Sequence, residues 1–306
     1  MRVLSIGEIL WDIFPDQERL GGAALNFSAN TARLGDSATL ITAIGDDARG
    51  RAALEIMRQL GLTTDCVHVV QGHATGVARV GVNASGDPCF EIPRPAAFDQ
   101  LTMTPDLYAD ALLNKSDWLY FGTLMQTEPH IEQIIEHLAQ TLPKIRCFYD
   151  INLREGHWNL PLVERLCHLA SILKLNEQEA RTLAKLSGIS VSEYSLTTFC
   201  EVWAKGFDID TICVTLGEAG CYVYSGDEEC NVPGYSTIVE DTVGAGDAFA
   251  AAFLHGFHHH WPIERIARFA NALGSIVASK AGATPNWSIE ECFTVAGISS
   301  GEIASY

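Results

Sequence analysis

The chain has 306 residues, of which 47% are hydrophobic and 19% are charged, a balance typical of folded globular proteins and not of disordered ones. Acidic side chains number 38 against 20 basic ones, and the formal net charge of -18 argues against a nucleic-acid-binding protein, whose surface must neutralise phosphates. No run of about 18 apolar residues could span a bilayer, and the N-terminus lacks the long apolar stretch of a signal peptide, so we expect no membrane partner and a cytoplasmic location.

Short apolar segments alternate with helical patterns along the chain, which predicts an α/β fold with a mainly parallel sheet covered on both faces. Strands are predicted at residues 3–7, 38–44, 118–122, 147–151, 172–175 and 211–215. Helices are predicted at residues 24–34, 50–60, 129–142, 160–169, 177–187, 245–259 and 263–281. Because no long linker divides the chain, residues 1–306 are expected to form a single domain.

Two segments depart from this alternation. Residues 9–20 are extended in character and lead into Gly21-Gly22, whereas residues 75–92 have the pattern of a strand, a turn from Asn83 to Pro88, and a second strand. We expect these segments to form a small β flap, inserted into the α/β domain from about residues 9–22 and 73–99. Such flaps often cover a site and exclude water during chemistry.

The most informative segment is Asp241-Thr242-Val243-Gly244-Ala245-Gly246-Asp247, which opens an apolar helix. Gly244, Ala245 and Gly246 leave backbone N–H groups at the positive end of the helix dipole, where an anion can bind. A carboxylate at Asp247 would repel a bound phosphate, but a base that takes a proton from an attacking hydroxyl has to stand beside the transferred group. For this segment alone, the favoured alternative is that Asp247 only stabilises the helix N-terminus.

Two other phosphate-binding motifs do not match this segment. A dinucleotide-binding fingerprint requires a third glycine where Phe249 stands, and the P-loop pattern Gly-x-x-x-x-Gly-Lys occurs nowhere in the chain. If phosphates bind here, the sequence belongs to another class of nucleotide-binding protein.

A second glycine-rich segment lies near the N-terminus, where Gly21-Gly22-Ala23-Ala24-Leu25-Asn26 enters a predicted helix. Paired glycines allow a polar ligand to approach the backbone closely. The Asn26 side chain offers a donor and an acceptor to vicinal hydroxyls. For this segment alone, the favoured alternative is that these residues cap the N-terminus of the helix.

Together, the two segments resemble the two signatures of the ribokinase-like, or PfkB, carbohydrate kinases. The first signature matches Gly21 through Asn26, Ser28 and Gly35 to Gly45, and the second matches Asp241 to Leu254. Further family elements stand between them in the expected order at Asp150 to Arg154, Asn176 to Glu179 and Thr215 to Gly220. The resemblance covers essentially the whole chain. It implies a ribokinase-like three-layer fold with a β lid, and an enzyme that uses Mg²⁺ and ATP to phosphorylate a hydroxymethyl group of a small carbohydrate.

The resemblance also implies roles for individual residues. Asp247 is the expected general base, with Gly244, Ala245 and Gly246 as the anion hole for the transferred phosphoryl group. The expected sugar contacts are Asp12, Gly22, Asn26, Arg94, Asn152 and Arg154. The expected nucleotide contacts are Asn176, Thr215, Gly217, Gly220 and Asn271.

Two ion sites follow from the same resemblance. Glu179, together with Asn176, is expected to hold Mg²⁺ through water, which suits an ion that keeps much of its hydration shell. A helix cap with an acidic first turn is the alternative for this pair. A monovalent cation such as K⁺ is expected to bind at Asp241, Val243 and Gly282 and to order the anion hole.

The acceptor is expected to be a ketohexose, fructose first. Arg154 with Trp158, and the stretch from Val214 to Cys221, follow the fructokinase pattern. Arg94 resembles an arginine of fructokinases and of 2-keto-3-deoxygluconate kinases, although Pro93 stands where those enzymes usually have an aromatic residue, and a solvated arginine is the alternative there. The other hypotheses are a 2-keto-3-deoxygluconate kinase, a ribokinase, a nucleoside kinase or a catalytically silent family member. A homodimer is favoured by analogy, since flap strands commonly pair between subunits in this family.

Overall fold

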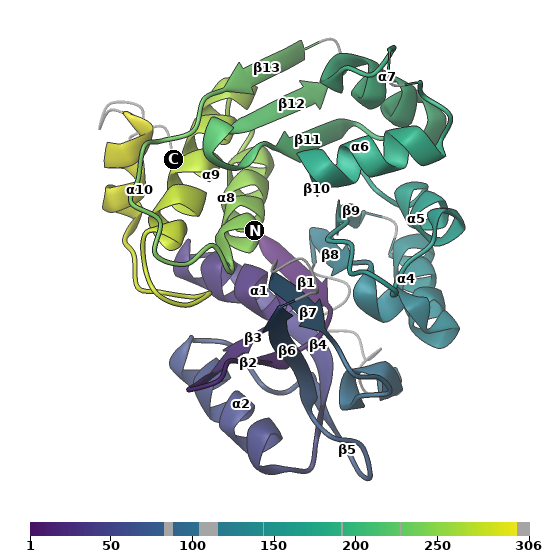
Figure 1. Cartoon of the computed structure of the whole chain (residues 1–306), viewed down its shortest axis with the longest axis vertical. Helices are drawn as coiled ribbons and strands as arrows, with labels where there is room; N and C mark the ends of the chain where they lie inside the picture. Colours follow the sequence, from purple (N-terminus) through teal and green to yellow (C-terminus); the bar gives the residue numbers. More distant parts are fainter. Residues whose placement is uncertain (83–87, 104–115, 143, 191, 227, 299–306) are drawn as a thin grey trace.

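The computed structural model describes the chain apart from residues 83–87, 104–115, 143, 191, 227 and 299–306 (Figure 1). Its main sheet has nine strands. They are β1 (Arg2–Ile6), β4 (Ser37–Gly45), β5 (Val67–Val70), β8 (Trp118–Gly122), β9 (Arg146–Asp150), β10 (Ile172–Asn176), β11 (Thr211–Thr215), β12 (Cys221–Ser225) and β13 (Glu228–Val232). Their order in space is β13-β12-β11-β10-β9-β8-β1-β4-β5. The pairs from β5 to β11 are parallel, whereas β12 and β13 join as antiparallel edge strands.

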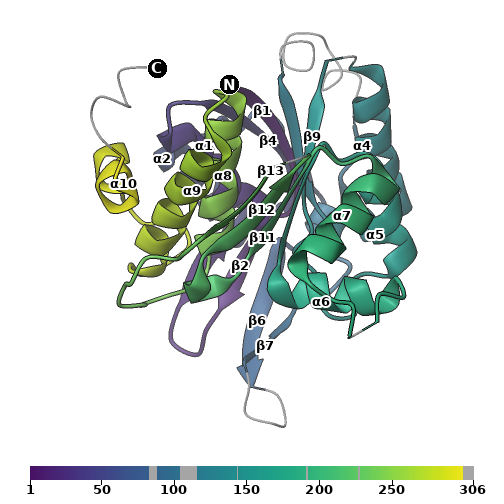
Figure 2. The same cartoon turned by 90° about the horizontal axis from the view of Figure 1, so that it is seen from above.

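Helices cover both faces of this sheet and complete three layers (Figure 2). One face carries α1 (Ala23–Arg33), α2 (Ala48–Gln59), α8 (Ala245–His258), α9 (Ile263–Ala278) and α10 (Ile289–Ala296). The other face carries α4 (Pro129–Thr141), α5 (Leu160–Cys167), α6 (Glu177–Leu186) and α7 (Leu196–Phe207). Short 3₁₀ turns lie at Ala97–Gln100, Leu124–Thr127 and Gly217–Ala219.

The central strands are apolar on both sides, as a sheet buried between two helical layers requires. In β8, Trp118 and Tyr120 pack into the core beneath α1, α8 and α9, whereas the alternate residues Leu119 and Phe121 pack into the core beneath α4 to α7. This double burial explains why the strands are recognisable in the sequence as nearly continuous apolar runs.

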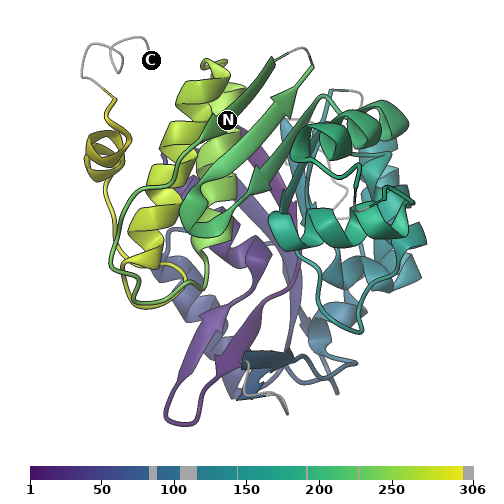
Figure 3. The ribbon, with the colours of Figure 1, turned by 45° about the horizontal axis from the view of Figure 1, so that its top comes forward.

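A second sheet of four strands projects from the main body (Figure 3). Its strands are β2 (Leu10–Ile13), β3 (Glu18–Gly21), β6 (Gly76–Val82) and β7 (Pro88–Glu91), in the order β3-β2-β6-β7. The two hairpins join through the parallel pair β2 and β6. These are the two segments predicted to form the flap, although the predicted turn, at residues 83–87, lies outside the described residues.

Every predicted strand and helix is present, with small shifts at their ends. The helix predicted from residue 50 begins at Ala48, because the side chain of Asp47 accepts a hydrogen bond from the Gly50 N–H at 2.7 Å and caps it. The helix predicted to reach residue 281 ends at Ala278. Among the helices that the structure describes, none has the length and apolar character needed to cross a membrane.

The sequence analysis missed several elements, namely β5, β12, β13, α7 and α10. Helix α7 is rich in β-branched and aromatic residues of low helix propensity, and it is stabilised by burying Phe199, Cys200 and Trp203 against the sheet. Strand β13 is an exposed edge with two glutamates, so it lacks the apolar run of a central strand.

Candidate active site

The glycine-rich segment from Asp241 to Asp247 leads into α8. Gly244 caps the helix with a φ of 80°, and a β-carbon there would lie 2.3 Å from the backbone oxygen of Ala283, so only glycine fits. The helix begins at Ala245, and Asp247 lies in its first turn with its side chain buried. The sequence therefore forms a tight turn that places the backbone N–H groups of the glycine turn next to the buried carboxylate of Asp247.

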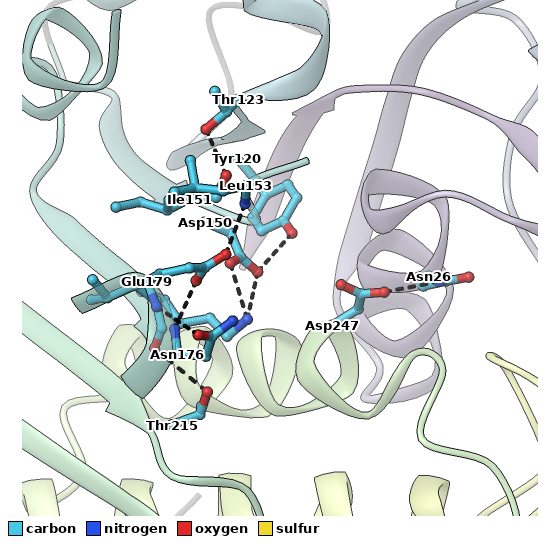
Figure 4. Close-up of polar contacts among 12 residues, drawn as sticks. Asn26, Tyr120, Thr123, Asp150, Ile151, Leu153, Asn176, Glu179, Thr215 and Asp247 are labelled. Atoms are coloured by element: carbon cyan, nitrogen blue, oxygen red, sulfur yellow. Dashed lines mark hydrogen bonds and ion pairs between the residues drawn. The ribbon is translucent and has the colours of Figure 1, made fainter. Parts of the chain in front are cut away.

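Asp247 also contacts the N-terminal glycine-rich segment, Gly21 to Asn26. The side chain of Asn26, on α1, donates a hydrogen bond from Nδ2 to Asp247 Oδ2 at 2.8 Å (Figure 4). Burial, and after it the nearby Asp150 carboxylate, raise the pKa of Asp247 to about 6, although the Lys174 ammonium partly opposes them. A carboxyl group with this pKa is ionised at neutral pH and accepts a proton more readily than an ordinary aspartate.

Two of the predicted sugar contacts, Asn152 and Arg154, line a small hollow at the start of α1. Glu8, Tyr120 and Thr123 line it as well, together with Ala23 and Ala24 of α1. Glu8 Oε1 accepts the Ala23 N–H at 3.1 Å and so caps α1 in place of the side chain that Gly22 lacks. At Gly22 itself, φ is 114° and a β-carbon would lie 2.3 Å from the Glu8 backbone oxygen.

Two more carboxyl and amide groups shape this region. Burial raises the pKa of Asp12, on β2, to about 6, and the Arg154 guanidinium partly offsets that shift. Asn152 adopts a left-handed backbone with φ of 44°, which turns the chain after β9 towards Arg154. The Oδ1 atom of Asn26 is buried and accepts no hydrogen bond within the described part of the chain, which leaves an acceptor for a ligand hydroxyl.

Arg94 occupies a different position from Arg154. Its guanidinium donates to Asp99 Oδ1 at 2.5 Å, to Glu128 Oε1 at 3.1 Å and to the Leu124 carbonyl at 3.1 Å. It lines a separate cleft with Trp158. A contact between Arg94 and the sugar therefore remains a prediction, and the structure gives this residue two carboxylate partners of its own.

Four of the five predicted nucleotide residues, all except Asn176, line one cleft of about 610 Å³, a size typical of small-molecule sites. Its lining includes Thr215, Gly217, Gly220 and Asn271, together with Ala245 and Gly246 of the glycine turn. Asn271 also donates from Nδ2 to the Val232 carbonyl at 3.1 Å and so ties α9 to the end of β13. The cleft runs up to the turn that carries Asp247.

Asn176 and Glu179 form a capping box at the start of α6. Asn176 Oδ1 accepts the Glu179 N–H at 2.9 Å, and Glu179 Oε2 accepts the Asn176 N–H at 2.8 Å. The other carboxylate oxygen, Oε1, accepts the Leu153 N–H at 2.7 Å and so fixes the loop between Asn152 and Arg154. Asn176 is the register partner of Thr215, which places the pair beside the nucleotide cleft. Each oxygen keeps a second lone pair, so the donor set suits Mg²⁺ held through water better than direct ligation.

Comparisons with known proteins agree with this geometry. The family model for pfkB family carbohydrate kinases matches residues 13–290. The chain belongs to this family. It is 30% identical over 314 residues to fructokinase-1 of Oryza sativa subsp. japonica, which covers 93% of this chain and 94% of the relative. It is 28% identical over 309 residues to fructokinase-2 of the same plant, with coverage of 92% and 90%.

Solved structures of two other kinases superpose over nearly the whole chain. The fructokinase of Xylella fastidiosa with bound ATP gives a TM-score of 0.84 at 22% identity and covers 97% of this chain and 98% of its own. The aminoimidazole riboside kinase of Salmonella enterica gives a TM-score of 0.80 at 25% identity, with coverage of 97% and 100%. These likenesses confirm the predicted ribokinase-like fold, and the family confirms a sugar kinase.

The sequence analysis of this PfkB kinase overlooked a buried ionic group beside Asp247. Lys174 Nζ lies 3.0 Å and 2.9 Å from the two carboxylate oxygens of Asp150, and the Tyr120 hydroxyl donates to Asp150 Oδ2 at 3.2 Å (Figure 4). A β-carbon on Gly246 would lie 3.3 Å from Lys174 Nζ, so the ammonium is adjacent to the glycine turn. One signal was available: a single lysine inside the apolar strand Ile172-Leu173-Lys174-Leu175 must find a partner when buried.

Proposed function

We propose that this sugar kinase transfers the γ-phosphoryl group of Mg-ATP to a hydroxymethyl group of a neutral ketohexose, fructose first, with Asp247 as the general base. The observation that carries the proposal is the position of the Asp247 carboxylate. It lies on the turn that lines the nucleotide cleft, and it accepts a hydrogen bond from Asn26, one of the predicted sugar contacts.

In this mechanism, the sugar hydroxyl donates its proton to Asp247 as its oxygen forms a bond to the γ-phosphorus and the bond to the ADP oxygen breaks. The N–H groups of Gly244, Ala245 and Gly246 stabilise the charge on the transferred group, aided by the N-terminal dipole of α8. Mg²⁺, when bound, neutralises charge on the β- and γ-phosphates, and Asn176 and Glu179 would hold it through water. Thr215, Gly217, Gly220 and Asn271 orient the nucleotide.

Charge around the sugar hollow favours a neutral acceptor over a sugar acid. Three carboxyl groups, of Glu8, Asp12 and Asp247, lie near the guanidinium of Arg154, which lowers the pKa of all three. Arg94 also lowers the pKa of Glu8, and Arg19 lowers that of Asp12, but Arg94 is paired with Asp99 and Glu128, and Arg19 is paired with Asp241. A substrate carboxylate would meet these three carboxyl groups with Arg154 as the remaining guanidinium among these residues, so 2-keto-3-deoxygluconate should bind less well than fructose.

Relative rates with different acceptors provide the test. With saturating Mg-ATP, we expect kcat/KM for fructose to exceed the values for 2-keto-3-deoxygluconate, ribose and adenosine, because buried polar groups left unpaired by the wrong sugar can cost a factor of about 10,000. Aminoimidazole riboside belongs in the panel, since the Salmonella kinase is similar in structure. If ribose, a riboside or adenosine is preferred by about tenfold or more, the fructose assignment is wrong while the kinase activity stands.

The acid limb of the pH profile should report the base. Because burial raises the pKa of Asp247 to about 6, the base is protonated below that pH, and kcat/KM should fall as the pH is lowered from about 7 to about 5. The pKa of Asp12 is also raised to about 6, so the control is Asp12→Asn. That variant should have weaker sugar binding but keep the acid limb of kcat/KM. A kcat/KM that is independent of pH in this range would contradict the role of Asp247, provided that the chemical step limits the rate.

A further inference from the structure

The residues expected to bind a monovalent cation are already bonded to one another. Asp241 Oδ1 accepts the Val243 N–H at 3.0 Å, and Asp241 Oδ2 accepts the Gly282 N–H at 3.1 Å. A third donor reaches the same carboxylate from the second sheet: Arg19 Nη1 lies 2.6 Å from Asp241 Oδ2. Asp241 Oδ1 thus accepts one hydrogen bond and Oδ2 accepts two, and the permanent positive charge of Arg19 stands beside Oδ2.

Arg19 is held in place by its own hairpin. It lies on β3, its Nε donates to Gln17 Oε1 at 3.2 Å, and its guanidinium lies 5.6 Å from the ring centre of Phe14. The charged groups around it are Asp241 and Asp12, which is its partner in the antiparallel register of β2 and β3. The side chain is about one-third exposed, at 32%, so most of it is covered.

The stretch from residue 280 to residue 286, on the other side of the expected site, carries cations as well. Lys280 Nζ donates to the Asn286 carbonyl at 2.9 Å, and Arg33 Nη1 donates to the Pro285 carbonyl. Two carbonyl oxygens that could coordinate K⁺ are thus hydrogen-bonded to the basic side chains of Lys280 and Arg33. The donor set does not fit a bound monovalent cation as long as these contacts hold.

We infer that Arg19 takes the place of a monovalent cation at Asp241, and that this kinase therefore works without K⁺. The loop from Asp241 leads directly into Gly244 and the anion hole, so a fixed charge at Asp241 holds that turn in position. The hairpin of β2 and β3 carries both Asp12, the proposed sugar contact, and Arg19. The flap would therefore bind the sugar and also place a positive charge beside Asp241. This role presupposes the phosphoryl transfer proposed above.

Turnover in different salts tests whether Arg19 takes the place of the cation. Wild-type kcat should be the same in KCl and in tetramethylammonium chloride at equal ionic strength, measured with whichever sugar the enzyme accepts. Arg19→Ala should lose about tenfold or more of its kcat in tetramethylammonium chloride and regain most of it in KCl, whereas Arg19→Lys should stay independent of K⁺. The matched control is Arg49→Ala, which breaks an exposed ion pair with Glu18, the neighbour of Arg19 on β3. It should leave kcat unchanged in both salts.

A second measurement does not depend on catalysis or on the identity of the sugar. In the presence of Mg-ADP, KCl should raise the melting temperature of Arg19→Ala relative to tetramethylammonium chloride, but leave that of the wild type unchanged. Activation of the wild type by K⁺ of about threefold or more would overturn the inference. The inference would also be overturned if the activity and melting temperature of Arg19→Ala were the same with and without K⁺, because Arg19 would then stabilise the flap without replacing a cation.

Discussion

Asp247→Asn is expected to lower kcat by a factor of about 100 to 10,000, the range typical for loss of a general base. The amide cannot take the proton of the attacking hydroxyl, but it has the same shape as the carboxylate. Asn26 can still donate a hydrogen bond to the new side-chain oxygen, and the glycine turn of the anion hole is untouched. The KM for ATP should therefore change little, and the loss should appear in single-turnover rates.

The folded state should tolerate this change. Burial raises the pKa of Asp247, so ionisation of the native carboxyl group opposes folding at neutral pH, and a neutral amide removes that cost. The melting temperature of Asp247→Asn should thus equal or exceed that of the wild type. Wild-type turnover in a purified Asn variant would exclude Asp247 as the base.

Local patterns in the sequence were sufficient to predict the parts of the fold that depend on neighbours along the chain. The central strands are apolar on both faces, and the turn before Asp247 requires glycine at Gly244, so both leave a clear mark in the sequence. The spacing of Asn176 and Glu179 likewise predicts the cap of α6. Elements such as α7 and β13 are stabilised by tertiary contacts against their local preferences, and they were missed for that reason.

The parts that could not be predicted are pairings between distant residues. Arg19 is 222 positions from Asp241, and Lys174 is 24 positions from Asp150, so no local pattern connects either pair. Arg19 alone has an ordinary interpretation as a charged side chain on the surface, and Lys174, inside an apolar strand, indicates a buried partner without saying which residue it is. Only the fold brings Arg19 to Asp241 and Lys174 next to the anion hole.

Lys174 is where the second large effect is expected. The ammonium and the Asp150 carboxylate are both buried, with exposures of 7% and 1%. Burial, the largest single influence, lowers the pKa of Lys174, but the carboxylates of Asp150, Asp247 and Glu179 together outweigh it and raise that pKa, so the ammonium is charged at neutral pH. Lys174→Met leaves Asp150 without its cation in the core, a change that typically costs about 3 to 5 kcal/mol of the free energy of unfolding.

Denaturation by urea measures this loss. Arg58→Met is the matched control, because it breaks a pair with Glu55 in which both side chains are more than half exposed, at 55% and 62%, and should have no measurable effect. The double variant Lys174→Met/Asp150→Asn removes both charges and should recover much of the stability, since a buried pair of charges contributes little in net terms. An equal loss in the single and double variants would show that packing, and not charge, explains the cost.

The same variants separate a structural role of Lys174 from an electrostatic role at the base. After burial, Asp150 raises and Lys174 lowers the pKa of Asp247. Lys174→Met should therefore move the acid limb of kcat/KM to higher pH, because the base now titrates beside an uncompensated carboxylate. In the double variant the two influences disappear together, and the limb should return towards its wild-type position near pH 6. If the acid limb of kcat/KM stays at the wild-type pH in both variants, the role of Lys174 is structural and not electrostatic.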